Sequence, residues 1–298
     1  MSARRVLGVL VVAIVAAAAS VSVGSAQTRI HRAGGTVSVL FAGSLVGAME
    51  QQIGPAFAKA TGYGYQGFGA GSKAVASQIK SKLKQGDVFI SASPAVNNSL
   101  YGASNGNWVT WYGTFASSPL VIGYSSSSRF ASAFKSDKRW WNVLQSSGLL
   151  LGRTDPAIDP KGQLTIQFLH RVEVAKNLPG LSQRILGATE NPAQVFPEET
   201  LVGRLQAGQL DAGFFYSIEA KAANLLTVNP PLGAHYSARY TITILNNAPN
   251  AAGALAFVKY LLGPQGVAIL KADGFQLVHG QIGLQKRAVP ADVKTLLG

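Results

Sequence analysis

The segment Thr36-Val-Ser-Val-Leu-Phe-Ala-Gly-Ser44 carries the pattern that decides the fold. Its first part, residues 36–41, is short, rich in β-branched and apolar residues, and followed by Ala-Gly, as is typical of a buried strand. Ser44 then begins a helical repeat in which Met49, Ile53 and Phe57 return every four residues. A buried strand that leads directly into an amphipathic helix is the first half of a β-α-β unit, so an α/β protein is predicted.

The next stretch repeats this arrangement. A second strand is expected over residues 63–68, followed by the turn Gly69-Ala-Gly-Ser72 and a helix that runs to Lys84. Gly86-Asp87 then turns into a third strand over 88–92. Because crossover connections between parallel strands are right-handed, these elements predict one parallel layer covered by helices.

The remainder of the chain alternates in the same way. The pattern predicts strands at 119–124, 149–152, 212–216 and 240–245, helices at 140–145, 163–177, 198–207 and 251–262, and a final helix and turn over 266–277. The chain therefore begins and ends with segments that flank a middle α/β unit. Two lobes joined by two crossing segments fit this order, with lobe I formed by residues 36–118 and 241–298 and lobe II by residues 119–240.

The composition excludes several classes of site. The 298 residues include no cysteine, so disulfide scaffolds, zinc–cysteine sites, thiolate catalysis and a lipid-modified N-terminal cysteine are all ruled out. The four histidines lie far apart and never in HxxxH or HExxH spacing, so a histidine-rich metal site is not expected. With 47% hydrophobic residues, the chain has ample material for a folded core.

The N-terminus has the order of a secretory signal peptide. Arg4 and Arg5 precede an uncharged stretch whose centre, residues 7–19, is almost purely aliphatic, and Gly24-Ser-Ala26 supplies small residues for cleavage. We therefore expect residues 1–26 to be removed and the protein to be exported to the periplasm or extracytoplasmic face. An uncleaved N-terminal membrane anchor is the alternative, since the stretch approaches the length of a spanning helix.

Basic residues outnumber acidic ones by 26 to 13, and residues 27–298 keep a net charge of +11. Nucleic acid, acidic envelope polymers and small anions are the partners that such charge suggests. The longest basic cluster is Lys80-Ser-Lys-Leu-Lys84, where Val75, Ile79 and Leu83 are expected to form a buried helical face that leaves the lysines in solvent. No nucleic-acid motif is present, so nucleic acid is not expected as a partner.

Two strand-to-helix turns share one design, Ala42-Gly-Ser-Leu45 and Gly69-Ala-Gly-Ser72. Such turns lie at the carboxyl ends of parallel strands, where ligands bind in α/β proteins. Glycine lets the backbone approach a guest closely, and the free N–H groups of a first helical turn favour an anion. The alternative is that Ser44 and Ser72 are plain helix caps. Neither turn is a P-loop, and no GxSxG elbow makes Ser44 a nucleophile.

Three segments of the middle unit offer further polar groups. The loop over 153–162 contains Asp155 and Asp159, either of which would also cap the helix that follows. Glu198 lies at the start of a predicted helix, where an acid is favourable on dipole grounds alone. Tyr216 ends a predicted strand and has a hydroxyl to donate.

These segments together resemble the extracytoplasmic molybdate/tungstate-binding proteins of ABC transporters. The resemblance starts with residues 36–92 and covers essentially the whole chain after the leader through Pro119-Leu-Val-Ile-Gly-Tyr124 and the segments 154–162, 205–216, 251–262 and 266–275. It implies an α/β fold of the two-lobed periplasmic-binding-protein type II class, with mixed or parallel sheets, helices on both faces and two crossover strands. It also implies a receptor, not an enzyme, that closes over a tetrahedral oxyanion and delivers it to a membrane permease.

Carried over residue by residue, the resemblance assigns the two ligand-contacting serines to Ser44 and Ser72. The loop before the long helix implies a backbone donor at Lys161 and, as in the archaeal-type tungstate binders, a carboxylate at Asp159 that contacts the metal of the oxyanion directly. The tyrosine maps to Tyr216, and a backbone donor at a helix start falls near Glu198. No cofactor, no free metal cation and no second copy of the chain are implied.

The chain also departs from the family pattern. Archaeal-type members carry a glutamate immediately before the tyrosine, where this chain has Phe215. With one carboxylate missing, we expect tetrahedral binding through hydrogen bonds in place of six-coordination. Asp159 then needs to be neutralised by Lys161 or Arg153, or to lie behind the ligand contacts. A receptor for sulfate or another tetrahedral oxyanion is the nearest alternative, and an exported hydrolase using Ser44 is an alternative from a different class.

Overall fold

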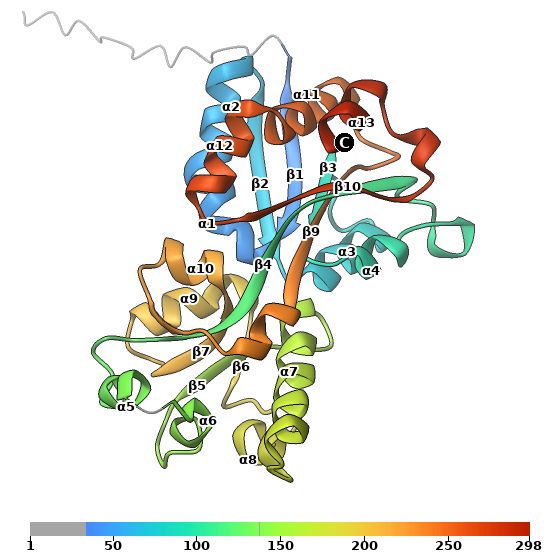
Figure 1. Ribbon diagram of the computed structural model, residues 1–298. Helices are drawn as coiled ribbons and strands as arrows, with labels where there is room; N and C mark the ends of the chain where they lie inside the picture. Colours follow the sequence, from blue (N-terminus) through green and yellow to red (C-terminus); the bar gives the residue numbers. More distant parts are fainter. Residues whose placement is uncertain (1–33, 137) are drawn as a thin grey trace, which may run out of the picture. The chain divides into compact units, whose positions relative to one another are not determined.

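The computed structural model describes residues 34–136 and 138–298 (Figure 1). The predicted signal peptide over residues 1–26 lies outside the described residues. The described residues all belong to one compact unit.

The predicted parallel layer is confirmed. Strands β1 (Thr36–Ala42), β2 (Gly64–Ala70) and β3 (Val88–Ser91) are parallel, with β1 in the middle. The helical segment after β1 contains η1 (Gly43–Leu45), α1 (Val46–Ala48), the wide π-type turn η2 (Met49–Ile53) and α2 (Gly54–Thr61). Its expected apolar face, Met49, Ile53 and Phe57, is completely buried.

The helix after β2 is shorter than expected. Helix α3 (Ser72–Lys80) ends four residues before Lys84, and Lys82 has a left-handed backbone with φ of 60°. Leu83 consequently has 75% of its surface exposed, so its placement on the buried face is wrong, whereas Val75 and Ile79 are buried as expected.

Two long strands cross the middle of the molecule side by side (Figure 1). Strand β4 (Trp111–Tyr124) pairs antiparallel with β9 (Ser237–Ile244). The first part of β4 also pairs with β10 (Gln276–Leu284), and its end, from Leu120, pairs with β7 (Ala212–Tyr216). The sequence predicted only the last six residues of β4 and missed β10. The lobe boundaries stay a prediction, and we keep the names lobe I and lobe II for those two sets of residues.

The remaining strands are β5 (Leu151–Thr154), β6 (Val195–Phe196) and β8 (Leu226–Val228). Hydrogen bonding connects the main strands in the order β2-β1-β3-β9-β4-β7-β5-β6. Since parallel pairs lie at both ends of this order and antiparallel pairs in the middle, the mixed α/β fold class is confirmed.

Helices cover these strands. They are α4 (Pro94–Asn98), η3 (Ala103–Asn105), α5 (Ala131–Ser136), α6 (Trp140–Val143), α7 (Pro160–Lys176), α8 (Leu181–Leu186), α9 (Glu198–Gln206), α10 (Ser217–Ala222), η4 (Pro231–His235), α11 (Ala251–Leu262), α12 (Pro264–Ala272), η5 (Lys286–Ala288) and α13 (Ala291–Leu297). No single helix within 34–136 and 138–298 has the length and composition of a membrane span; the bent pair α11 and α12 passes that test only together.

Candidate ligand-binding site

Ser44 and Ser72 lie at the same edge of the parallel layer. Strands β1 and β2 are in register up to Ala42 and Ala70, and each serine follows two residues later. Neither serine caps its helix through its side chain. The Ser44 hydroxyl accepts a hydrogen bond from the Tyr240 hydroxyl (3.1 Å), and the Ser72 hydroxyl accepts one from the Ala92 N–H (3.0 Å). Each serine therefore keeps its own hydroxyl hydrogen for another acceptor, and the plain-cap interpretation fails.

The glycines beside these serines are needed for close approach between lobe I and lobe II. A Cβ on Gly43 would lie 2.9 Å from Glu198 Oε2. A Cβ on Gly71 would lie 2.9 Å from the carbonyl oxygen of Ile158 and 3.2 Å from Asp159 Cβ. The two 2.9 Å distances are shorter than real Cβ contacts. A side chain at position 71 would therefore push the lobe II backbone away, and one at position 43 would displace the Glu198 carboxyl.

Asp159 caps the long helix α7, as one of the two interpretations predicted. Its Oδ1 accepts hydrogen bonds from the Thr154 hydroxyl (2.7 Å) and the Lys161 N–H (2.9 Å). The Lys161 N–H, implied as a ligand donor, is therefore engaged by Asp159. The other carboxylate oxygen, Oδ2, is buried without a hydrogen-bond partner.

The Lys161 side chain is completely buried behind this turn. Its ammonium lies 2.7 and 2.9 Å from the two oxygens of Glu219 and 3.5 Å from Glu198 Oε1. Burial lowers the pKa of Lys161, but the charges of Glu219, Glu198 and Asp159 outweigh burial and raise the pKa above its usual value. Lys161 therefore stays charged and bonds Glu219 instead of neutralising Asp159. The Arg153 guanidinium is also directed elsewhere, to Gln194 and the Ala188 carbonyl.

Glu219 is a buried site residue that the sequence interpretation missed. Besides holding Lys161, it accepts a hydrogen bond from the Tyr216 N–H (2.8 Å) and so ties β7, α7 and α10 together. Burial raises the pKa of Glu219, although Lys161 opposes the shift. An acid three residues after the end of a strand matches the capping-box spacing, which is the signal that was available.

Glu198 and Tyr216 have buried polar atoms without hydrogen-bond partners. Both carboxylate oxygens of Glu198 and the Tyr216 hydroxyl are in this state. Burial and the charge of Asp159 raise the pKa of Glu198 well above its usual value. The sequence identified Glu198 by its helix-start backbone, whereas the side chain is the unusual group.

Tyr240, on the crossing strand β9, is the second missed residue. Its ring packs edge-on against Tyr216, with ring centroids 6.2 Å apart. Burial raises the pKa values of both tyrosines well above their usual value, and nearby acids add to the shift. Both hydroxyls are thus protonated at neutral pH.

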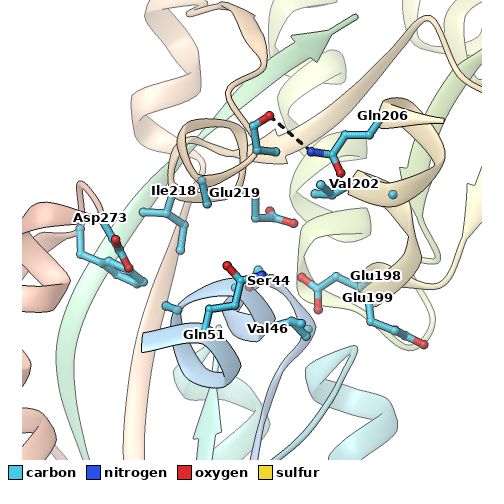
Figure 2. Close-up of a pocket in the computed structure, with 17 residues that line it drawn as sticks. Ser44, Val46, Gln51, Glu198, Glu199, Val202, Gln206, Ile218, Glu219 and Asp273 are labelled. Atoms are coloured by element: carbon cyan, nitrogen blue, oxygen red, sulfur yellow. Dashed lines mark hydrogen bonds between the residues drawn. The ribbon is translucent and has the colours of Figure 1, made fainter. Parts of the chain in front are cut away.

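A cavity of about 230 Å³ opens beside this cluster between α1, α9 and α10 (Figure 2). Ser44, Glu198 and Glu219 line it, and Figure 2 shows these three side chains near one another among the residues around the cavity. Ser72, Asp159, Lys161 and Tyr216 do not line the cavity but lie in the adjoining buried cluster. Sites for drug-sized ligands are about 300–1,000 Å³, so this cavity suits a small solute.

The charged groups do not form a metal centre. Within the part of the chain that the structure describes, no group of three or more His, Cys, Asp or Glu side chains is arranged to hold a metal ion. The cluster consists of the Ser44 and Ser72 hydroxyls from lobe I, the Tyr240 hydroxyl from the crossing strand β9 and, from lobe II, the Tyr216 hydroxyl with three carboxyls and one ammonium.

The chain is similar in sequence to several known proteins. The profile of the family described as bacterial extracellular solute-binding protein matches residues 37–276. A protein of Haloferax volcanii, named for molybdenum binding in an ABC transporter, is 29% identical over 78% of this chain and 68% of its own length. A molybdate/tungstate-binding protein of Thermococcus kodakarensis is 24% identical over 64% of this chain and 66% of its own.

Among solved structures, the periplasmic molybdate-binding protein of Azotobacter vinelandii is similar, with a TM-score of 0.62 and 25% identity. The match covers 82% of this chain and 100% of that one. Because the matched share is larger than either lobe, the similarity reaches residues of both lobe I and lobe II.

Proposed function

The chain belongs to the bacterial extracellular solute-binding proteins, and from that premise we propose that it captures molybdate or tungstate between lobe I and lobe II. It is a binding receptor and not an enzyme, so the hydrolase alternative at Ser44 is set aside. An ABC permease in the membrane is the proposed recipient of the ligand. Export through the predicted leader at residues 1–26 is part of the same proposal.

The observation that carries the proposal is the group of buried hydroxyls with hydrogens to donate. Ser44 and Ser72 each accept a hydrogen bond and retain their own hydrogen, and the Tyr216 hydroxyl has no partner. Tyr240 connects Ser44 to Tyr216. Buried polar groups are normally hydrogen-bonded, so these donors favour a ligand that is rich in hydrogen-bond acceptors. A tetrahedral oxyanion presents four oxygens and no required donors.

The similar proteins support the choice of oxyanion. Two relatives and one solved structure are named for molybdenum, molybdate or tungstate binding. Sulfate has the same charge and shape but is smaller, so cavity size is the main physical basis for discrimination. With Phe215 in place of a second carboxylate beside Tyr216, we propose that the metal of the oxyanion stays four-coordinate and that Asp159 does not contact it.

Thermal unfolding of residues 27–298 with molybdate, tungstate, sulfate or phosphate tests the function. A ligand at 100 times its dissociation constant adds about 2.7 kcal/mol to the free energy of unfolding. Molybdate or tungstate is expected to raise the Tm at the lowest concentration. A clear shift with sulfate or phosphate, and none with molybdate or tungstate, would contradict the proposal.

Serine substitutions test the site. Ser44→Ala and Ser72→Ala should each weaken tungstate binding by about 1–3 kcal/mol, because a charged ligand oxygen loses its donor. Ser77→Ala, on the exposed side of α3, is the matched control and should leave the affinity unchanged. Unchanged affinity in both Ser44→Ala and Ser72→Ala, measured by calorimetry, would show that the ligand does not contact these turns.

A further inference from the structure

Glu198 is enclosed with no donor for its carboxyl group. It is the first residue of α9, and the absence of a side chain on Gly43 lets its Oε2 approach the η1 turn. The closest cation is the Lys161 ammonium, 3.5 Å from Oε1, which already holds both oxygens of Glu219 at 2.7 and 2.9 Å. Glu198 therefore faces the lobe I serine turn with a carboxyl that no hydrogen bond stabilises as an anion.

The charges around Glu198 are unbalanced. The titratable groups that interact with Glu198 are Asp159 at the N-cap of α7, Lys161 from α7, Glu219 from α10, Tyr216 from β7 and Tyr240 from β9. The elements packed against α9 add Arg153 from β5 and Tyr65 from β2, and η1 contributes none. Arg153 is directed to Gln194 and Ala188, and Tyr65 is directed to Glu50. Three buried carboxyls thus share one buried ammonium, and the half-buried Lys73 of α3, which donates to the Pro156 carbonyl (3.0 Å), adds a positive charge near Asp159.

A proton resolves this imbalance, and the hydrogen bonds indicate where it resides. Asp159 Oδ1 accepts two hydrogen bonds and Glu219 accepts three, whereas Glu198 accepts none. Donors stabilise a charged carboxylate, and burial without donors favours the neutral acid. Glu198 is therefore the carboxyl that holds the proton, and a hydrogen bond from the neutral acid to the neighbouring Asp159 carboxylate adds to burial in raising its pKa.

We propose that Glu198 sets the pH range over which the cleft binds an oxyanion, by meeting the ligand as a neutral carboxylic acid whose hydrogen turns from Asp159 to a ligand oxygen. The proposal rests on the oxyanion function given above. Where Glu198 is ionised in the open cleft, one proton passes from water to its carboxylate as the cleft fills, and returns to water on release. Its ionised form repels a dianion, so the affinity for the dianion depends on this single proton.

Calorimetric titration with tungstate between pH 6 and 9 tests the proposal. Tungstate affinity of the wild-type chain should be constant at low pH and fall up to tenfold per pH unit above the pKa of Glu198 in the open cleft. Glu198→Gln should bind with a flat profile, because the amide donates a hydrogen bond without titrating. Glu190→Gln removes an exposed acid that does not line the cavity and should keep the wild-type slope.

The number of protons taken up when tungstate binds can be measured on the same samples. In the falling part of the profile, titrations in buffers of different ionisation enthalpy should show about one proton taken up per tungstate by the wild type. Glu198→Gln should take up none.

The outcomes separate this proposal from the function on which it rests. A flat wild-type profile, or the same slope in Glu198→Gln, overturns the role of Glu198 while tungstate binding stands. A loss of more than a hundredfold in Glu198→Gln at every pH also overturns it, since an amide then fails to replace a direct carboxylate contact. If neither tungstate nor molybdate binds to the wild type, the oxyanion function itself fails.

Discussion

The two sides of the candidate site differ in charge. Lobe I contributes Ser44 and Ser72, on turns whose neighbouring glycines add no side chain. Lobe II contributes three buried carboxyls and the ammonium of Lys161. A dianion between them has only neutral donors on the lobe I side, whereas on the lobe II side the one hydroxyl donor, Tyr216, lies among three carboxyls. The charges on the lobe II side must therefore neutralise one another before this side can accept an anion.

Removal of the Lys161 ammonium should have the largest effect, a decrease in the free energy of unfolding, and it tests whether the lobe II side is internally neutralised. Lys161→Met leaves the lobe II carboxyls without a cation, and breaking one partner of a buried pair costs about 3–5 kcal/mol. The free energy of unfolding, measured with urea, should fall by that amount. Lys176→Met, at the exposed end of the same helix α7, is the control.

The double variant Lys161→Met/Glu219→Leu sharpens this result. It removes both members of the closest pair and should regain most of the lost stability. Equal destabilisation by Lys161→Met and Lys176→Met would contradict the account of lobe II as a neutralised cluster.

Adding a side chain where the lobe I turn contacts the lobe II loop should have an intermediate effect, which is expected on tungstate affinity. The added methyl group of Gly71→Ala meets the Ile158 carbonyl, so the lobe II loop has to move away from the serine turn. Overpacking costs about 1–3 kcal/mol, which corresponds to roughly a 5- to 150-fold weaker tungstate affinity. Gly47→Ala is the matched control, since its Cβ would lie 3.9 Å from Ala222. Equal affinities of the two variants would show that the two sides need not approach this closely.

The pH dependence of stability without ligand should show the smallest effect. Burial raises the pKa values of Glu198 and Glu219 above those in the unfolded chain, so the folded state binds more protons once the pH exceeds about 4.5. Stability from these two groups is therefore greatest below about pH 4.5 and decreases as the pH rises towards their folded pKa values. The Tm of Glu198→Gln should fall less than that of the wild type between pH 5 and 8. A wild-type Tm that falls no more steeply than that of Glu198→Gln would contradict the account.

The sequence predicted the lobe I side better than the lobe II side. A buried strand followed by Gly-Ser has a local pattern, so the positions of Ser44 and Ser72 at neighbouring strand ends were predictable from short segments. Glu219 was not recognised because an acid in the first turn of a helix is usually solvent-exposed. Its burial depends on Lys161, which lies 58 residues away in the chain.

The short strands β6 and β8 and two longer strand segments were not predicted, and the longer two were missed for a similar reason. The first part of β4, from Trp111, and the whole of β10 contain many small and polar residues, so they lack the apolar period of a strand. They form strands because they pair with each other, and β4 pairs also with β9. The end of α3 was misplaced because the left-handed backbone at Lys82 leaves no mark in the apolar pattern.

The most direct test of the central claim is diffraction at the tungsten absorption edge from crystals grown with tungstate. We expect one anomalous peak between Ser44, Ser72 and Tyr216, with four oxygens around the metal. The Glu198 carboxyl should lie within hydrogen-bond distance of one of these oxygens. A peak elsewhere, no peak, or a metal bonded directly to a carboxylate oxygen of Asp159 or Glu198 would contradict the central claim.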